Sequence, residues 1–159
     1  MDTQLLSYLD KNNIRYKIHV HPAVFTVYES KELKQKIPGL HCKTLFLKDE
    51  NGMFYLVGMP AEKRLNIKKL EKYLGVKKLR FGSEGELKRE VNLEPGSVSI
   101  FGAIYIKDKN IKLVIDKEVW DAEITGFHPN FNTATLEIKH EDLKKFYDSL
   151  SCEKEIVVL

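Results

Sequence analysis

Lys43 is the residue whose position most calls for a chemical explanation. It opens an apolar run, residues 43–48, that alternation predicts to be a buried strand. On such a strand Lys43 shares one face with Leu45 and Leu47. An ammonium group on an apolar face is costly to bury unless an anion pairs with it. Lys43 therefore either binds an anionic ligand or lies at the strand edge with its ammonium in water.

Residues 94–102 are a second candidate, because the segment EPGSVSIFG concentrates glycine and serine in a short stretch. The backbone N–H groups of such a loop can converge on a phosphate or carbonyl oxygen. Gly96, Ser97 and Gly102 are the residues of this segment that could take part in such a site. Taken alone, the segment also fits an ordinary turn.

Two histidines, His19 and His21, share one face if they lie on a strand. This spacing could begin a metal site, but no carboxylate or cysteine cluster completes one, and framing of a polar pocket is the alternative. Cys42 and Cys152 are far apart and form no C-x-x-C pair. The sequence also lacks phosphate-loop, dinucleotide-binding and G-x-S-x-G motifs. We expect no metal and no cofactor.

The composition excludes several classes of protein. The chain has 159 residues, 43% hydrophobic and 31% charged, which predicts one globular domain over residues 1–159. A net charge of +3 permits an anionic partner without requiring one. No run of 18 apolar residues is present, and the first residues do not resemble a secretory signal. We expect a cytoplasmic protein without a membrane span.

Helix and strand patterns are interleaved along the whole chain, which predicts a mixed α/β (α+β) domain. Capping residues and apolar spacing predict helices that begin after residues 2, 30, 66 and 83 and at residue 141. Strands are expected at 16–19, 43–48, 53–57, 79–81, 111–115, 122–127, 133–138 and 156–159.

Four segments, taken together and in this order, carry a resemblance to a known family. They are residues 21–26 (HPAVFT), 43–49 (KTLFLKD), 95–102 (PGSVSIFG) and 126–135, which contains GFHPN and NTAT. The chain resembles the YbaK/prolyl-tRNA synthetase-associated editing domain family over about residues 5–138, and within it the freestanding type similar to Ala-tRNA(Pro) deacylases. The resemblance implies a compact domain with a mixed, largely antiparallel sheet flanked by helices.

The resemblance also implies an activity, hydrolysis of the ester that joins a wrong amino acid to tRNA(Pro). An aminoacyl ester is already activated, so positioning and electrostatics can supply most of the catalysis. Lys43 would hold the 3′-terminal adenosine region, the 94–102 loop would face the carbonyl oxygen, and the adenosine 2′-hydroxyl could assist the attacking water. Alanine is the expected amino acid; the alternatives are Cys-tRNA(Pro) deacylation and a non-catalytic aminoacyl-tRNA-binding or regulatory module.

Several further residues are candidate substrate contacts. They are His21, Val24, Phe25, Thr26, Thr44, Ser99, Phe101, His128 and Asn130. Aromatic residues at such positions are also ordinary core residues, and His128 could instead order the loop before Pro129. A synthetase site that accepts proline can exclude the smaller alanine by only roughly 1–3 kcal/mol of binding free energy. A second, smaller site could admit alanine and exclude proline. The chain departs from the family pattern at Thr44, at Ile100 and over residues 103–106.

A basic run between residues 62 and 80 is the candidate tRNA-binding surface. It contains eight basic and two acidic residues, a local balance of +6. The residues expected to contact tRNA are Lys63, Arg64, Lys68, Lys69, Lys72 and Arg80. The alternative is a solvated helix face. We expect a monomer that meets mischarged tRNA(Pro) in trans, with prolyl-tRNA synthetase as a candidate partner.

Overall fold

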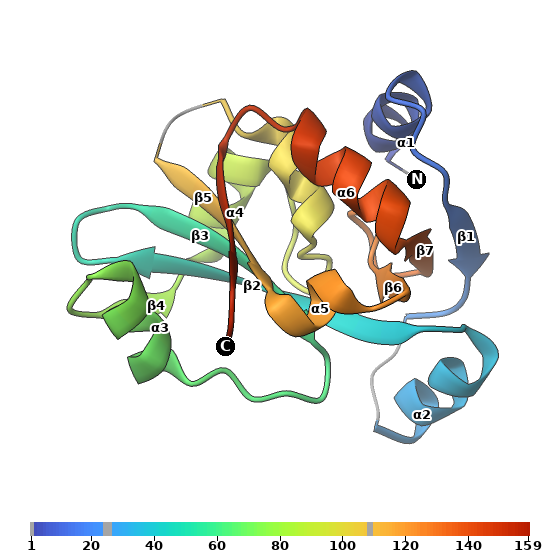
Figure 1. The fold of residues 1–159 in the computed structure, drawn as a ribbon, viewed down its shortest axis with the longest axis horizontal. Helices are drawn as coiled ribbons and strands as arrows, with labels where there is room; N and C mark the ends of the chain where they lie inside the picture. The colour runs from blue at the N-terminus through green and yellow to red at the C-terminus, as the bar shows by residue number, and fades with distance from the viewer. Residues whose placement is uncertain (1, 24–26, 108–109) are drawn as a thin grey trace.

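The computed structural model describes residues 2–23, 27–107 and 110–159. Their strands form one sheet in the order β1-β7-β6-β2-β3-β5-β8, with β4 paired to β2 outside this path (Figure 1). The strands are β1 Lys17–Val20, β2 Leu40–Asp49, β3 Phe54–Pro60, β4 Leu79–Phe81, β5 Ile111–Asp116, β6 Ile124–Phe127, β7 Ala134–Lys139 and β8 Glu153–Val157. The helices are α1 Thr3–Lys11, α2 Val27–Lys36, α3 Ile67–Leu74, α4 Glu84–Val91, α5 Lys117–Asp121, α6 His140–Ser149 and the 3₁₀ helix η1 Ile100–Tyr105.

Both strand directions occur in this sheet, as predicted. The pairs β1–β7, β6–β7, β2–β3 and β2–β4 are antiparallel. The pairs β2–β6, β3–β5 and β5–β8 are parallel. Figure 1 shows α5 and α6 across one face of the sheet, and α2 set apart beside the ends of β1 and β2. The expected mixed domain with a sheet flanked by helices is confirmed.

Local signals in the sequence explain where most helices begin and end. The Asn66 side chain accepts a hydrogen bond from the Lys69 N–H at 3.1 Å, and Gly75 ends α3 at φ +72°. Ser83 and Glu86 form the predicted capping box at the start of α4. Helix caps of this kind can be predicted directly from the residue types and their spacing in the sequence.

Other elements differ from the prediction where their signals are weak. Helix α2 begins at Val27 and not after Ser30, and β8 spans Glu153–Val157 and not 156–159. The strand β8 lies at the sheet edge and begins with three consecutive charged residues, 153–155, so only its last two residues are apolar. Helices η1 and α5 have no counterpart in the prediction, since η1 is an apolar run without helical period and α5 is only five residues long.

The two faces of the sheet pack against different groups of residues. Phe46, with Leu56, belongs to the main core shared with helices α1, α4 and α6 and with η1. Leu47 belongs to a second core that includes Leu70 of α3, and Leu45 packs against the same core. Because side chains alternate along a strand, Lys43 shares the face of Leu45 and Leu47, as predicted.

None of the helices in the described ranges has the length and apolar character that crossing a lipid bilayer would require.

Candidate active site

The site begins where β6 parts from β2. Their parallel ladder pairs Leu40 with Thr125 and His41 with Gly126, and it ends there. Further along the same edge of β2, the ladder with β4 begins at Leu47. We call residues 42–46, between the two ladders, the open edge of β2. Lys43 lies two residues beyond the last pair on β2, and His128 lies two residues beyond it on the other chain segment, directly after the end of β6 at Phe127.

Lys43 is half-buried on this face, beside the buried Met59 of β3 with which it pairs in register. Among the described residues, Lys43 has no acidic partner. Three other half-buried lysines, Lys48, Lys63 and Lys112, do pair with a carboxylate, and a fourth, Lys154, donates to the Leu150 carbonyl. A half-buried ammonium without a carboxylate is suited to bind an anionic ligand.

Two imidazoles lie on the same face as Lys43, and their hydrogen bonds fix where each proton sits. His21 Nδ1 is 2.8 Å from the Pro22 carbonyl oxygen, so Nδ1 donates, and the Thr135 hydroxyl donates to Nε2 at 2.9 Å. His128 Nδ1 is 3.2 Å from the Ala134 carbonyl oxygen, so it also donates. The Nε2 of a neutral His128 then carries a lone pair, which can accept a proton from water.

The electrostatic surroundings of His128 favour this neutral form. Burial lowers the pKa of His128 below its ordinary value, and the nearby His21 lowers it further, while the hydrogen bond to Ala134 acts in the opposite direction. An imidazole that is neutral near pH 7 can act as a general base or can orient a water molecule.

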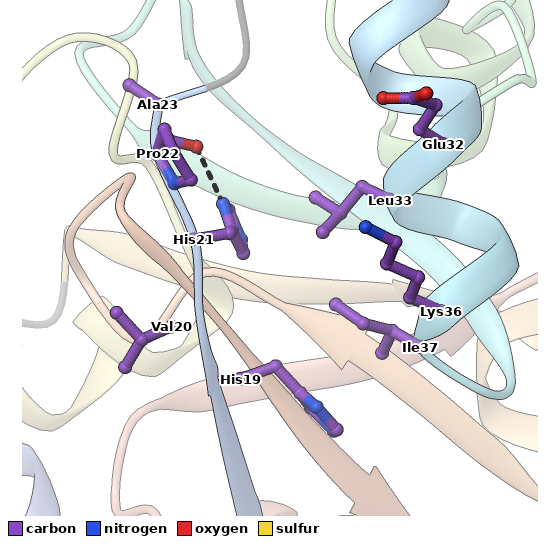
Figure 2. Close-up of a pocket in the computed structure, with 9 residues that line it drawn as sticks. All are labelled: His19, Val20, His21, Pro22, Ala23, Glu32, Leu33, Lys36 and Ile37. Atoms are coloured by element: carbon purple, nitrogen blue, oxygen red, sulfur yellow. Dashed lines mark hydrogen bonds between the residues drawn. The ribbon is translucent and has the colours of Figure 1, made fainter.

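A pocket of about 600 Å³ opens between the end of β1 and helix α2. Figure 2 shows His19 and His21 on its β1 side, facing Leu33 and Lys36 of α2 and Ile37 directly after it, with Val20 pointing away. His19 Nε2 lies 2.9 Å from Glu137 Oε1, a carboxylate on the neighbouring strand β7. The two histidines therefore frame a pocket, the alternative to a metal site in the sequence prediction.

The sequence prediction omitted the residues that hold these histidines. Thr135 and Glu137 lie on β7, where they share the face of His19 and His21. Thr135 and Glu137 are two residues apart on their strand, as His19 and His21 are on theirs. A correct prediction that β1 pairs with β7 would therefore have identified Thr135 and Glu137 as neighbours of the histidines. Lys36 was also omitted, because nothing in the sequence links α2 to β1. The described residues contain no group of three or more His, Cys, Asp or Glu side chains that could hold a metal ion.

The 94–102 loop has strong internal contacts. Gly96 has φ +83°, a conformation that favours glycine, and the Ser97 N–H donates to the Glu94 carbonyl at 3.1 Å. The Ser99 side chain caps η1 by accepting from the Phe101 N–H at 3.2 Å. The Gly102 N–H donates to the Ser99 carbonyl at 3.0 Å. A role for these residues toward a substrate carbonyl stays a prediction.

Three of the predicted site residues have contacts within the protein that give their residue type a structural role. A Cβ on Gly102 would lie 2.7 Å from the Leu93 side chain. Phe101 is fully buried and packs edge-on against Phe146, with the ring centroids 4.9 Å apart. Asn130 Nδ2 donates to Asp2 at 2.9 Å and so ties the β6–β7 turn to the start of α1. The predicted contacts Val24, Phe25 and Thr26 lie outside the described residues.

The predicted tRNA-binding residues divide into two groups. Arg64, Lys68, Lys69 and Lys72 are exposed. Lys63 is half-buried, and its Nζ lies 2.9 Å from the buried Asp116 carboxylate. Arg80 donates to the Phe81 carbonyl at 3.0 Å and lies 3.4 Å from Glu86. The first group is the part of the run whose charge is directed to solvent.

The family model and the most similar known proteins point to the same family. Residues 21–146 match the aminoacyl-tRNA editing domain family. The chain is 32% identical over 142 residues to the prolyl-tRNA editing protein ProX of Acetoanaerobium sticklandii, covering 89% of this chain and 87% of that protein. It is 33% identical over 138 residues to the prolyl-tRNA synthetase associated domain-containing protein 1 of Bos taurus, covering 84% and 80%.

Solved structures agree on the fold. A crystal structure described as a candidate trans-editing enzyme for prolyl tRNA synthetase superposes with a TM-score of 0.75 at 16% identity, covering 98% of this chain and 94% of that one. The fold and the sequence match define the class as aminoacyl-tRNA editing domains. The chain belongs to this family.

The lowered pKa of His128 predicts a pH dependence of stability. The unfolded chain titrates this histidine at about 6.5, and the folded chain does so at a lower pH. The unfolded state therefore binds more protons in the window between, so the free energy of unfolding should decrease as the pH falls through it. NMR titration of the His128 ring, with urea unfolding at pH 7.5 and 5.5, measures both effects. A His128 titration at or above pH 6.5 contradicts the prediction, and His128→Gln should reduce the pH dependence.

Proposed function

We propose that the protein hydrolyses the ester bond of mischarged tRNA(Pro), and that alanine is the amino acid it removes. The observation that carries the proposal is Lys43, a half-buried cation without an acidic partner among the described residues, in a chain of the editing family. The names of the relatives point to prolyl-tRNA as the RNA. The terminal adenosine with its ester is the anionic, activated ligand that such a cation suits.

In the proposed reaction, the Lys43 ammonium binds a phosphate or the acyl carbonyl oxygen of the tRNA 3′ end. A water molecule attacks the carbonyl carbon, and the Nε2 of neutral His128 or the adenosine 2′-hydroxyl assists the removal of its proton. The tetrahedral intermediate then loses the ribose oxygen, which takes up a proton. The products are the free amino acid and uncharged tRNA. Positioning and charge supply most of the rate, because the ester is already reactive.

The proposed specificity depends on size. A pocket that fits the methyl group of alanine excludes the proline ring by steric contact, whereas the synthetase site must accept both. We place the acyl group on the face that carries His21 and His128. Val24, Phe25 and Thr26, which continue the chain from this face, are the proposed walls.

We expect the purified protein to deacylate Ala-tRNA(Pro) at least about tenfold faster than Cys-tRNA(Pro) or Pro-tRNA(Pro), as one small apolar difference allows. Loss of radiolabelled amino acid from each tRNA measures the rates. Fastest cleavage of Cys-tRNA(Pro) would instead assign a Cys-tRNA(Pro) deacylase. Binding without cleavage of any of the three would support a non-catalytic module.

Lys43→Ala should lower the rate on Ala-tRNA(Pro) at least about a hundredfold, the scale expected for removal of a group that stabilises developing charge. Lys144→Ala is the matched control, since Lys144 is an exposed lysine on α6 that pairs with Asp148. Single-turnover deacylation measures both variants. Wild-type activity in Lys43→Ala would overturn the mechanism.

Reversal of charge at Lys68, Lys69 and Lys72 should weaken tRNA binding and make it less dependent on salt. Each lost phosphate contact reduces the slope of log K against log salt by about 1, so we expect a change of roughly 2–3. The same reversal at Lys88, Lys117 and Lys144, three exposed lysines of other helices, is the control. A slope equal to that of the wild type would make the α3 lysines an ordinary solvated face.

A further inference from the structure

The Asp2 carboxylate joins three segments of the chain that are far apart in the sequence. Its Oδ1 accepts from the Leu5 N–H at 3.1 Å and so caps helix α1. Tyr105, the last residue of η1, donates its hydroxyl to this carboxylate, with both oxygens 2.7 Å away. Asn130 Nδ2, in the turn between β6 and β7, donates to Oδ2 at 2.9 Å. A helix cap needs only the first of these contacts, so the other two require a separate explanation.

These hydrogen bonds fix both the charge of Asp2 and the orientation of the Asn130 amide. Burial raises the pKa of Asp2, but hydrogen bonds from Tyr105, from Asn130 and from the backbone of α1 outweigh burial, so this pKa lies below its ordinary value. A charged carboxylate only accepts hydrogen bonds, so the Asn130 amide must present its nitrogen to Asp2. Among the described residues, Asn130 Oδ1 has no hydrogen-bond partner. The contact with Asp2 is therefore what orients this amide.

Asn130 lies within the turn that carries the His128 ring. His128 and Ala134 flank this turn, and His128 Nδ1 donates to the Ala134 carbonyl oxygen at 3.2 Å. Asn130 itself has φ +67°, a left-handed conformation that asparagine adopts more readily than most residues but that surrounding contacts must support. The hydrogen bond to Asp2 is such a contact. A turn that lost it would be free to shift, and the His128 ring would shift with it.

The same turn lies next to the 94–102 loop. A Cβ placed on Gly96 would lie 3.8 Å from Asn132 Nδ2 of the turn. Helix η1 begins inside this loop and ends at Tyr105. Asp2 therefore bonds to both neighbours, to the turn and to η1, and one carboxylate holds the two segments in a fixed relation.

We propose that Asp2 is a positioning residue for deacylation of the aminoacyl-tRNA: through Asn130 it holds the β6–β7 turn, and with it the His128 ring, in the geometry that the reaction uses. The importance of that geometry rests on the proposed function. Asp2 does not touch the substrate in this arrangement and acts only through Asn130. Its loss should therefore slow the chemical step more than it weakens the binding of tRNA.

Two replacements separate this role from helix capping. Asp2→Ser keeps a favourable N-cap, but its side chain is too short to reach Asn130 and Tyr105 as well. Asp2→Asn also keeps the cap, and the Asn130 amide can turn over and accept a hydrogen bond from the introduced amide nitrogen. Capping is thus similar in the two variants, whereas the link to the turn is lost only in Asp2→Ser.

The His128 ring reports the effect without any substrate. In NMR spectra of the full chain, its signals and their titration should shift in Asp2→Ser and stay as in the wild type in Asp2→Asn. Asp142→Ser is the matched control, because Asp142 is a buried carboxylate of α6 that accepts from the Arg15 N–H at 2.9 Å. It should destabilise the fold and leave the His128 signals in place. No shift in Asp2→Ser, or an equal shift in Asp2→Ser and Asp142→Ser, would overturn the proposal.

Deacylation kinetics distinguish this proposal from the proposed function. At a temperature where every variant is folded, the maximal single-turnover rate on Ala-tRNA(Pro) should be at least about tenfold lower in Asp2→Ser, because small misplacements of a reacting group have large effects on rate. Asp2→Asn should stay within about twofold of the wild type, and the protein concentration that gives half the maximal rate should change little in either variant.

Equal maximal rates in the wild type and Asp2→Ser would contradict the role of Asp2 and leave the deacylase intact. His128 signals that depend on Asp2, in a wild-type protein that cleaves no aminoacyl-tRNA(Pro), would support the link from Asp2 to the ring and contradict the deacylase.

Discussion

The candidate site depends on how β2 divides one of its edges between two partners. One edge pairs continuously with β3, from Cys42 to Lys48, whereas the other edge pairs with β6 up to His41 and with β4 from Leu47. A strand in the middle of a sheet normally has both edges closed, because buried main-chain groups need hydrogen-bond partners. Along the open edge of β2 neither β6 nor β4 forms a ladder pair, although the Phe46 carbonyl at its end accepts from the Gly82 N–H at 2.9 Å.

The same arrangement explains why a lysine can occupy an apolar face. Lys43 shares the face of Leu45 and Leu47, which pack against the second core, but it lies beyond the cover that α3 provides through Leu70. Lys63, in contrast, is held by the buried carboxylate of Asp116, which also caps α5. The charge of Lys63 is therefore largely committed to the fold, whereas Lys43 has no acidic partner among the described residues, which supports the proposal that it binds an anion.

Much of the fold is predictable from the sequence because local signals are strong. The Asn66 cap, the Gly75 stop and the capping box of Ser83 and Glu86 specify helix ends by residue type alone. The alternation of residues 43–48 predicts correctly which side chains share a face, since the period of a strand is two. Helix η1 is not predictable in this way, because its apolar run has no period, and its cap, Ser99, lies within a serine- and glycine-rich loop.

The site is less predictable, because its members meet only through strand pairing. Lys43 and the histidines stand out in the sequence, but the contact of His21 with Thr135 joins residues 114 positions apart.

The proposed roles of Lys43 and His128 also have a chemical logic. Hydrolysis of an ester requires a group that remains cationic, to stabilise negative charge on oxygen, and a group that accepts a proton near neutral pH. Burial lowers the pKa of His128, and the nearby His21 lowers it further, so the ring is favoured in its neutral, proton-accepting form. In the proposed reaction, Lys43 would supply the lasting positive charge and His128 would accept the proton. The two tasks would then fall to two side chains whose surroundings differ, one an ammonium without an acidic partner among the described residues and the other a largely buried imidazole.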